Sequence, residues 1–316
     1  MTRVAAIDCG TNSIRMLVAD IDLHAETGAA SLTDVTRRME IVRLGEGVDR
    51  TGRFAPAALE RTFAACAGYA KVVDAAGAER VRFVATSASR DVDNRDDFAA
   101  GVRAALGVDP EVVTGDEEAA LSFAGATREL LDGDYEAPFL VVDIGGGSTE
   151  LVLGAPEVGD TGVQAARSVD VGCVRMTERH LHDDPPTPDQ VAAARADVEA
   201  AIAVAALTVP LNRAATLVGL AGSVTTVSAM ALDLPAYLPE RIHRSRITAQ
   251  QVHSVSRRLL AMSRTERAVL PFMHPGRVDV IAAGALILSC VLGAVPVDDV
   301  VVSEHDILDG IAWSLG

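Results

Sequence analysis

The strongest constraint in this sequence is a short pattern that occurs twice. Its first copy is residues 7–13 (IDCGTNS) and its second is residues 142–148 (VDIGGGS). Each copy lies between two apolar runs that are typical of buried strands, so each predicts a β-hairpin with a tight turn. Glycine lets a turn approach a ligand closely, and the turn's N–H groups can converge on an anion. The repeat therefore predicts two related halves that face one polyphosphorylated ligand.

The length and the order of the elements indicate two α/β domains. A chain of 316 residues is longer than a single hydrophobic core usually supports. We place the boundary at the polar stretch 131–138, which gives domains over residues 1–130 and 131–303, and we expect the last helix, within 304–316, to pack back on the first domain. Because strand and helix signals alternate in both halves, we expect two mixed sheets of similar build, covered by helices.

The individual elements follow from apolar periodicity and turn residues. We predict strands at 4–8, 15–22, 38–44, 80–86, 111–113, 139–143, 149–154, 163–170, 216–220 and 300–302. We predict helices at 57–76, 94–106, 115–131, 174–182, 188–206, from 222 onward, at 276–291 and at 305–315. Two capping boxes, at 248–251 and 263–266, predict two further helix starts.

Composition excludes several classes of protein. The formal net charge of −16 argues against broad binding to nucleic acid or membranes. No uninterrupted apolar run reaches the ~18 residues of a membrane span, and the N-terminus leads straight into the first strand rather than into a signal peptide. The four cysteines are widely spaced without a CxxC, which favours a reducing cytoplasm over a zinc site or a disulfide framework.

One segment is strongly basic. Residues 241–277 contain eight arginines and a single acid, Glu266. These arginines either lie on solvated helix faces or form a basic track for an extended polyanion, since guanidinium groups suit phosphate oxygens. On the second interpretation the residues that hold distal phosphates are Arg244, Arg246 and Arg258.

Four glycine- or hydroxyl-bearing elements are candidate phosphate sites: residues 10–13, 145–149, 172–175 and 222–226. The last two begin predicted helices, where free N–H groups and the helix dipole favour phosphate. Three consecutive glycines are hard to explain as a bare turn, because each costs ~1 kcal/mol of backbone entropy relative to alanine. The sequence has no GxxxxGK[ST] and no GxGxxG that opens a helix, which disfavours a P-loop enzyme and a dinucleotide-binding fold.

Acidic residues accompany the two repeated turns. Asp8 and Asp143 end buried strands, where a carboxylate either binds a metal or a metal-bound water, or caps its own turn. Because the arrangement occurs twice, we favour the metal. Glu150 follows the second turn closely and can face the same site. Glu117 and Glu118 begin a helix, where the dipole favours acids in any protein.

Together these motifs resemble the exopolyphosphatase/guanosine pentaphosphate phosphatase (Ppx/GppA) family. The matching strings are residues 7–13, 85–90 (ATSASR), 115–119 (GDEEA), 143–150 (DIGGGSTE), 172–178 (GCVRMTE) and 221–226 (AGSVTT), with further matches near 277–285. The resemblance implies two ribonuclease H-like domains of the actin, Hsp70 and sugar kinase superfamily, with a cleft between them. It also implies a short form that lacks the additional C-terminal helical phosphohydrolase-like domain of many members.

The resemblance further implies a role for each matching residue. Glu118 would be the general base, and Asp143 and Glu150 would hold the attacking water and the metal, with Asp8 as a further metal ligand. The metal would be Mg²⁺, or Mn²⁺ as the alternative. The implied phosphate-binding residues are Gly10, Thr11, Asn12, Ser13, Arg90, Gly145, Gly146, Gly147, Ser148, Thr149, Gly222 and Ser223.

The implied reaction is attack of water on the terminal phosphoryl group of inorganic polyphosphate, releasing orthophosphate. A guanosine pentaphosphate 5′-phosphatase of the stringent response uses the same chemistry, but few aromatic residues are present to stack on guanine. A kinase of the superfamily and a non-catalytic polyphosphate-binding module are further alternatives. We expect a cytoplasmic enzyme without nucleic-acid or membrane partners, and a homodimer as the commonest assembly.

Overall fold

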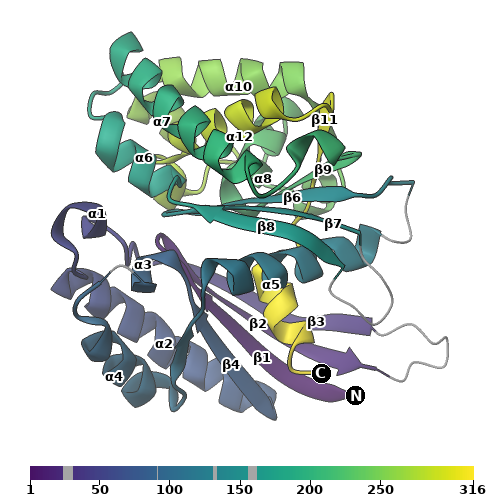
Figure 1. Ribbon diagram of the computed structural model, residues 1–316. Helices are drawn as coiled ribbons and strands as arrows, with labels where there is room; N and C mark the ends of the chain where they lie inside the picture. Colours follow the sequence, from purple (N-terminus) through teal and green to yellow (C-terminus); the bar gives the residue numbers. More distant parts are fainter. Residues whose placement is uncertain (24–30, 91, 131–133, 156–161) are drawn as a thin grey trace. The chain divides into compact units, whose positions relative to one another are not determined.

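The computed structural model describes residues 1–23, 31–90, 92–130, 134–155 and 162–316. The chain divides into two compact units: Met1–Gly125 with Ile307–Gly316, and Ala126–Asp306 (Figure 1). Part of the polar stretch predicted to link the domains, residues 131–133, lies outside the described residues. Among the described residues, no helix is both long enough and apolar enough to cross a bilayer.

The first unit is built on a five-stranded mixed sheet of order β3-β2-β1-β4-β5. Its strands are β1 (Thr2–Cys9), β2 (Ser13–Asp22), β3 (Ser31–Ile41), β4 (Arg80–Ala85) and β5 (Pro110–Val112). The strands β1, β2 and β3 pair antiparallel, whereas β1, β4 and β5 run parallel. The carboxyl ends of β1, β4 and β5 therefore lie at one edge of the sheet, the usual place for ligands in such sheets.

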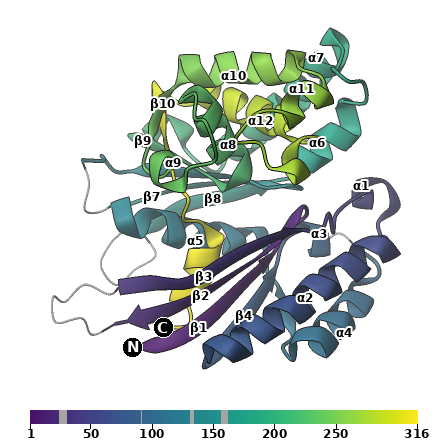
Figure 2. The ribbon, with the colours of Figure 1, turned by 180° about the vertical axis from the view of Figure 1, so that it is seen from behind.

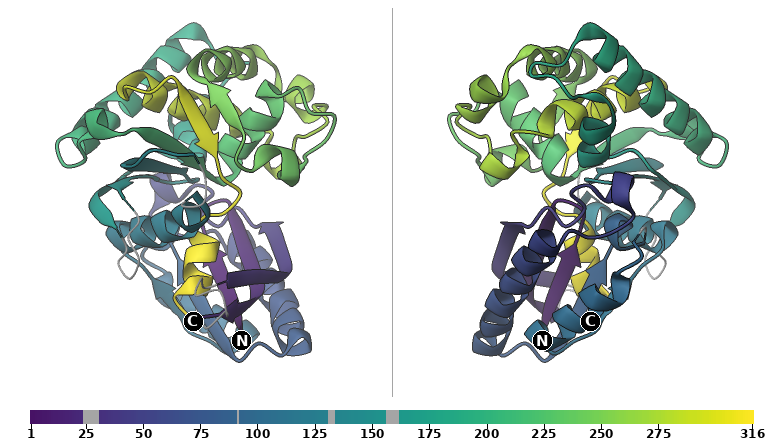
Figure 3. Two further views of the ribbon diagram at one scale, coloured as in Figure 1. Left: turned by 90° about the vertical axis from the view of Figure 1, so that its right-hand side faces the viewer. Right: turned by 90° about the vertical axis from the view of Figure 1, so that its left-hand side faces the viewer.

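Helices cover both faces of this sheet. They are α1 (Val48–Thr51), α2 (Pro56–Ala76), α3 (Ser87–Arg90), α4 (Arg95–Leu106), α5 (Gly115–Thr127) and α13 (Ile307–Trp313). Because side chains alternate along a strand, Ala5 and Ile7 of β1 pack in the core with α2 and α4 (Figure 2). Val4 and Ala6 pack on the opposite face with α13, which runs beside β1 (Figure 3).

The second unit repeats this sheet. Its strands are β6 (Phe139–Ile144), β7 (Thr149–Gly154), β8 (Val163–Val169), β9 (Thr216–Leu220), β10 (Arg246–Thr248) and β11 (Asp299–Val302). The order β8-β7-β6-β9-β11 matches β3-β2-β1-β4-β5, and β10 adds an antiparallel edge strand. The prediction of two sheets of similar build is confirmed.

The helices of the second unit are α6 (Cys173–His180), α7 (Pro188–Ala206), α8 (Ala221–Ala231), α9 (Pro239–Ile242), α10 (Ala249–Ala261), α11 (Arg264–Ala268) and α12 (Ile281–Ala294). Leu140, Val142 and Ile144 of β6 share one hydrophobic core with α6, α7, α8, α10 and α12 (Figure 1). Both predicted capping boxes are present and open α10 and α11.

Two predicted elements were misplaced. The helix predicted at 276–291 begins only at Ile281, because His274 caps a 3₁₀ turn at Pro275–Arg277, with its Nδ1 accepting from the N–H of Gly276. The strand predicted at 38–44 spans Ser31–Ile41 instead. Most of its side chains are polar and partly or fully exposed, so the apolar pattern that marks a buried strand is missing, and pairing with β2 defines its length.

Candidate phosphate-binding and catalytic site

The two repeated turns have the same backbone closure. In β1–β2 the N–H of Gly10 donates to the carbonyl of Ser13 at 3.0 Å, and in β6–β7 the N–H of Gly145 donates to that of Ser148 at 3.0 Å. The residues that flank the turns also correspond, since Asp8 lies opposite Arg15 and Asp143 lies opposite Glu150. The sequence repeat is therefore a structural repeat. One charge is reversed between the copies, because the position of Arg15 in the first unit is occupied by Glu150 in the second.

The glycine turn of the second unit is anchored by its carbonyl groups. The carbonyl of Gly145 accepts from the N–H of Cys173 at 2.9 Å, and that of Gly146 accepts from Val174 and Arg175. The side chain of Arg175 donates from Nε to the carbonyl of Gly147 at 2.8 Å. The expectation that residues 172–175 offer free N–H groups to phosphate is therefore wrong, because the first turn of α6 already donates them to the glycine turn.

This anchoring leaves the amides of the turn available. Among the residues that the structure describes, the N–H groups of Gly146 and Gly147 donate to no backbone carbonyl. A Cβ on Gly172 would lie 2.4 Å from the carbonyl oxygen of Gly146 and 2.6 Å from the nitrogen of Gly147. The close approach of Gly172 is thus what holds the turn, and successive amides in such a turn form an anion-binding concavity.

The first unit anchors its turn in the same way, through a segment that was not predicted from the sequence. The N–H of Gly45 donates to the carbonyl of Thr11 at 2.8 Å, and those of Val42 and Arg43 donate to that of Asn12. A Cβ on Gly45 would lie 2.2 Å from Cγ2 of Thr11. The signal was present in the sequence, since a glycine follows the third strand of each half, as Gly45 after β3 and as Gly172 after β8.

Two hydroxyl groups and one thiol at these turns are hydrogen-bonded or buried within the protein. Oγ1 of Thr11 lies 3.1 Å from Oγ of Ser87, and Oγ1 of Thr149 donates to the carbonyl of Val171 at 2.6 Å. Cys9 is 1% exposed, and burial raises the pKa of its thiol well above the usual range. Cys9 is therefore a small core residue rather than a nucleophile.

The reversed charge makes the two turns chemically different. In the first unit Arg15 donates from Nη2 to Oδ2 of Asp8 at 2.6 Å, so the carboxylate has a built-in counter-charge. In the second unit Asp143 and Glu150 are a cross-strand pair of buried carboxylates, and Oγ of Ser168 donates to Oε1 of Glu150 at 2.7 Å. Directly opposed side chains share a face of the sheet, and like charges there repel.

A divalent cation suits the second pair. Mg²⁺ binds proteins through one or two carboxylates and completes its shell with water and substrate phosphate. Within the described ranges, no three His, Cys, Asp or Glu side chains gather into a larger metal-binding group. The donor set of Asp143 and Glu150 fits magnesium, and the expected participation of Asp8 stays a prediction.

Glu118 and Arg90 meet at the carboxyl ends of β4 and β5. Nη1 of Arg90 donates to Oε2 of Glu118 at 2.8 Å and to the carbonyl of Val113 at 3.0 Å. Glu118 is buried, whereas the neighbouring Glu117 is half-exposed and pairs with Arg82 at 3.1 Å. The two acids at the start of α5 thus have different surroundings, because Glu118 is buried against Arg90 and Glu117 pairs with Arg82.

Gly222 and Ser223 begin α8 after the parallel strand β9. A Cβ on Gly222 would lie 2.3 Å from the guanidinium of Arg277, whose Nη1 donates to Oγ1 of Thr226 at 3.3 Å. A cation against a helix N-terminus adds to the positive end of the dipole, so this corner attracts an anion. Arg277 was not predicted as a site residue, although it lies in the basic segment.

The structure brings two of the three predicted distal arginines together. Arg244 and Arg246 lie 5.9 and 5.1 Å from the ring centre of Tyr135, and Arg246 also pairs with Asp299 at 3.3 Å. Arg258 is exposed in the last turn of α10, ~13 Å along that helix from its start. The binding of distal phosphates by these residues stays a prediction.

Comparison with known proteins identifies close relatives. The model of the Ppx/GppA phosphatase family matches residues 18–315. Exopolyphosphatase 2 of Mycobacterium tuberculosis is 52% identical over 324 residues, which cover 100% of this chain and 99% of the relative. A crystal structure described as an exopolyphosphatase-like protein has a TM-score of 0.93 at 43% identity, covering 100% of this chain and 99% of the other.

A relative with a different named activity is more distant. The guanosine-5′-triphosphate,3′-diphosphate pyrophosphatase of Aeromonas salmonicida is 26% identical over 98% of this chain and 59% of its own length.

Proposed function

The chain belongs to the Ppx/GppA phosphatase family, and on that premise we propose that it is an exopolyphosphatase, a hydrolase that releases orthophosphate from the end of inorganic polyphosphate. Its fold is the two-domain actin-like α/β fold of that family. The observation that carries the proposal is the anchoring of the Gly145–Gly147 turn, in which all three carbonyls accept hydrogen bonds from α6. Such a turn presents its amides to an anion.

We propose phosphate-binding groups in each of the two units. We assign this role to the turns Gly10–Ser13 and Gly145–Thr149, and to the start of α8 at Gly222 and Ser223. The guanidinium of Arg277 against Gly222 supports the assignment at α8, because arginine matches phosphate oxygens with several donors. Arg90 would contact phosphate with the guanidinium that also holds Glu118.

Hydrolysis would need a group that accepts a proton from the attacking water and a positive charge beside the phosphate oxygens. We assign Glu118 as the general base that takes a proton from the attacking water, and Arg90 as the group that orients it. Asp143 and Glu150 would hold the water and a magnesium ion, with Ser168 fixing the orientation of Glu150. When bound, the metal would supply positive charge to the phosphate oxygens as negative charge develops on them.

Two observations favour polyphosphate over guanosine pentaphosphate. The chain has only seven Phe, three Tyr and one Trp, so residues that stack on a guanine base are few. The relative of 52% identity is named an exopolyphosphatase, whereas the guanosine pentaphosphate relative is 26% identical. The four unpaired cysteines support the cytoplasmic location proposed from the sequence, and a homodimer remains part of the proposal.

The direct test is phosphate release from short polyphosphate, long polyphosphate, guanosine pentaphosphate and ATP in parallel, with Mg²⁺ varied. We expect the highest kcat/KM with polyphosphate, and loss of turnover when EDTA removes the metal. Preference for guanosine pentaphosphate would move the function to the alternative activity. Transfer of phosphate from ATP to an acceptor would instead indicate a kinase.

The distal arginines give a test of substrate length. Changing Arg244, Arg246 and Arg258 together to Ala should raise KM for long polyphosphate by about tenfold, because each exposed charge contact contributes up to ~1 kcal/mol. Short polyphosphate is the internal control, and its KM should change by less than about twofold if only distal phosphates are affected. Equal changes for both lengths would contradict the role of these arginines.

A further inference from the structure

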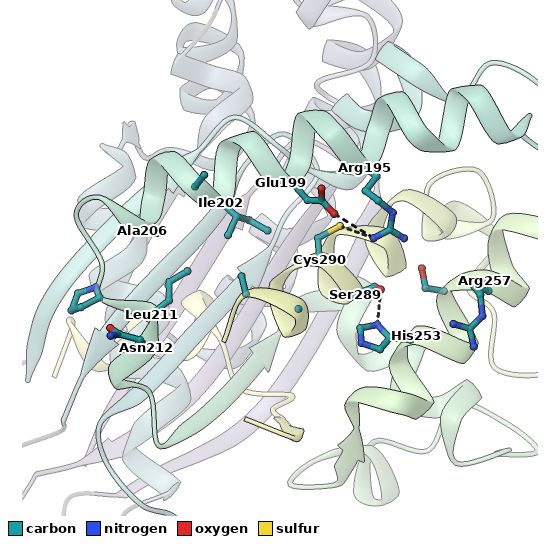
Figure 4. A pocket seen from close by; sticks show the side chains of 15 residues that line it. Arg195, Glu199, Ile202, Ala206, Leu211, Asn212, His253, Arg257, Ser289 and Cys290 are labelled. Atoms are coloured by element: carbon teal, nitrogen blue, oxygen red, sulfur yellow. Dashed lines mark hydrogen bonds and ion pairs between the residues drawn. The ribbon is translucent and has the colours of Figure 1, made fainter. Parts of the chain in front are cut away.

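The second unit contains a cavity of about 740 Å³ outside the site described above. It is lined by α7, α10, the C-terminal half of α12 and the loop after α7 (Figure 4). Gly284, in the first turn of α12, lies against Ser223 of the phosphate site, whereas Gly293 lines the cavity. Nine residues of helix separate these two glycines, a rise of ~13 Å, so the cavity is a separate place in the fold.

The cavity combines an apolar wall with polar groups. Ile202 of α7 and Leu211 of the following loop contribute apolar surface, and Figure 4 shows them on the side of the cavity away from Arg257. His253 and Arg257 project from α10, where residues four apart share a face. Nδ1 of His253 lies 2.8 Å from Oγ of Ser289 on α12. Volumes of ~300–1,000 Å³ with such linings are typical of small-molecule sites.

One polar group in this lining lacks a partner. Ser256 is 2% exposed, and its Oγ has no hydrogen-bond partner among the residues that the structure describes. Buried hydroxyl groups are nearly always satisfied in folded proteins, and each exception needs an explanation. Ser256 lines the cavity, but its Oγ has no accessible surface in this rotamer, so a bound molecule with a polar group can satisfy it once rotation about χ1 turns the hydroxyl toward the cavity.

The charges of the lining favour an anion. Arg257 is exposed and makes no ion pair within the described part of the chain. Arg195 also lines the cavity, and its guanidinium lies 3.6 Å from Glu199 and 3.6 Å from Sγ of Cys290. Burial raises the pKa of Cys290 to about 11, so the thiol is neutral and adds no negative charge at physiological pH.

From these observations we infer that the cavity is a second binding site, for a small organic anion with an apolar body and one acidic group. The apolar wall and Glu199 make it unsuitable for a bare polyphosphate chain. Ser256 and His253 would bind the polar part of the ligand, and Arg257 its charge. The inference does not depend on the proposed catalytic function, because the test below measures binding rather than turnover.

Anilinonaphthalene sulfonate is a suitable probe, because it joins aromatic rings to one sulfonate and fluoresces when its rings leave water. We expect saturable binding to one site on the wild-type chain. Gly293→Phe should weaken binding by more than tenfold, because Gly293 lines the cavity and a Cβ there has no atom within 4 Å, so a larger side chain would occupy the space of the ligand. The matched control is Gly68→Phe, since Gly68 lies on α2 in equally open space.

Unchanged binding by Gly293→Phe, or no saturable binding by the wild-type chain, would overturn the inference. If Gly293→Phe does not fold, as judged from its Tm, Gly293→Leu provides the same test with a smaller group.

The charge requirement is tested with Arg257→Ala. This change should weaken binding of the sulfonate probe about tenfold and leave the affinity for neutral N-phenyl naphthylamine within about twofold. Arg213→Ala, an exposed arginine outside the lining, is the control, and equal loss of both probes in Arg257→Ala contradicts an anion site.

Discussion

Replacing Glu118 with Gln should lower kcat for phosphate release from polyphosphate by about 10²–10⁴-fold, the usual contribution of a general base. The amide has nearly the same shape, and its oxygen can still accept from Nη1 of Arg90, which now lies 2.8 Å from Oε2. It cannot take a proton from water. We therefore expect polyphosphate affinity, measured by isothermal titration at saturating Mg²⁺, to stay within a few-fold of the wild type.

Glu117→Gln is the matched control for this variant. Both acids occupy the first turn of α5 and lose the same charge near the same helix dipole. Glu117, however, is half-exposed and pairs with Arg82, so its variant should keep kcat near the wild-type value. A Glu118→Gln enzyme with more than about a tenth of wild-type kcat would remove Glu118 from the role of base.

Arg90 needs a different experiment because one of its nitrogens serves two acceptors. Nη1 donates to Glu118 and to the carbonyl of Val113, so removal of the guanidinium disturbs the base and the end of β5 together. A fall in kcat alone would then not distinguish a phosphate contact from the orientation of Glu118. Only a change in KM that persists in the Glu118→Gln background reports on phosphate.

Local patterns predicted most of the fold because they depend on residues close in the chain. The capping boxes at Thr248 and Ser263 are four-residue motifs, and both open helices as expected. The strand β3 was misplaced because its polar residues are held by pairing with β2, a partner that the local pattern does not reveal. The start of α12 was misplaced because Val278 and Val280 continue the apolar pattern of the helix while the backbone turns.

The candidate site shows the same limit. The repeat predicted both turns, and the sequence also contains the reversed charge, because Arg15 and Glu150 each lie two residues after the matched serines and pair opposite Asp8 and Asp143. It did not predict that α6 donates its first amides to the glycine turn, since that depends on where the chain returns after β8. Gly45 was missed for the same reason, as its contact with Thr11 joins residues far apart in the sequence.

The anchoring of the glycine turn leads to the second large effect, expected for Gly172→Ala. The added methyl would lie 2.4 Å from the carbonyl oxygen of Gly146, 2.5 Å from its carbonyl carbon and 2.6 Å from the nitrogen of Gly147. All three are backbone atoms, so the turn or the start of α6 must move. We expect a loss of about 1–3 kcal/mol in the free energy of unfolding. We also expect a fall of about 10²-fold or more in kcat/KM, because displacement of binding groups by ~1 Å has that effect.

Gly45→Ala provides the contrast that identifies the cause. Its methyl would clash chiefly with Cγ2 of Thr11, at 2.2 Å, which is a side-chain atom. Thr11→Ser removes that atom and keeps the hydroxyl that meets Ser87, so the double variant should regain most of the stability that Gly45→Ala loses. No side-chain deletion can relieve Gly172→Ala in this way.

The control for both variants is Gly68→Ala on α2, where a Cβ meets no atom within 4 Å. This change should be neutral or raise the free energy of unfolding by up to ~1 kcal/mol. If Gly172→Ala matches Gly68→Ala in both Tm and kcat/KM, then close packing of α6 does not hold the turn in its active form.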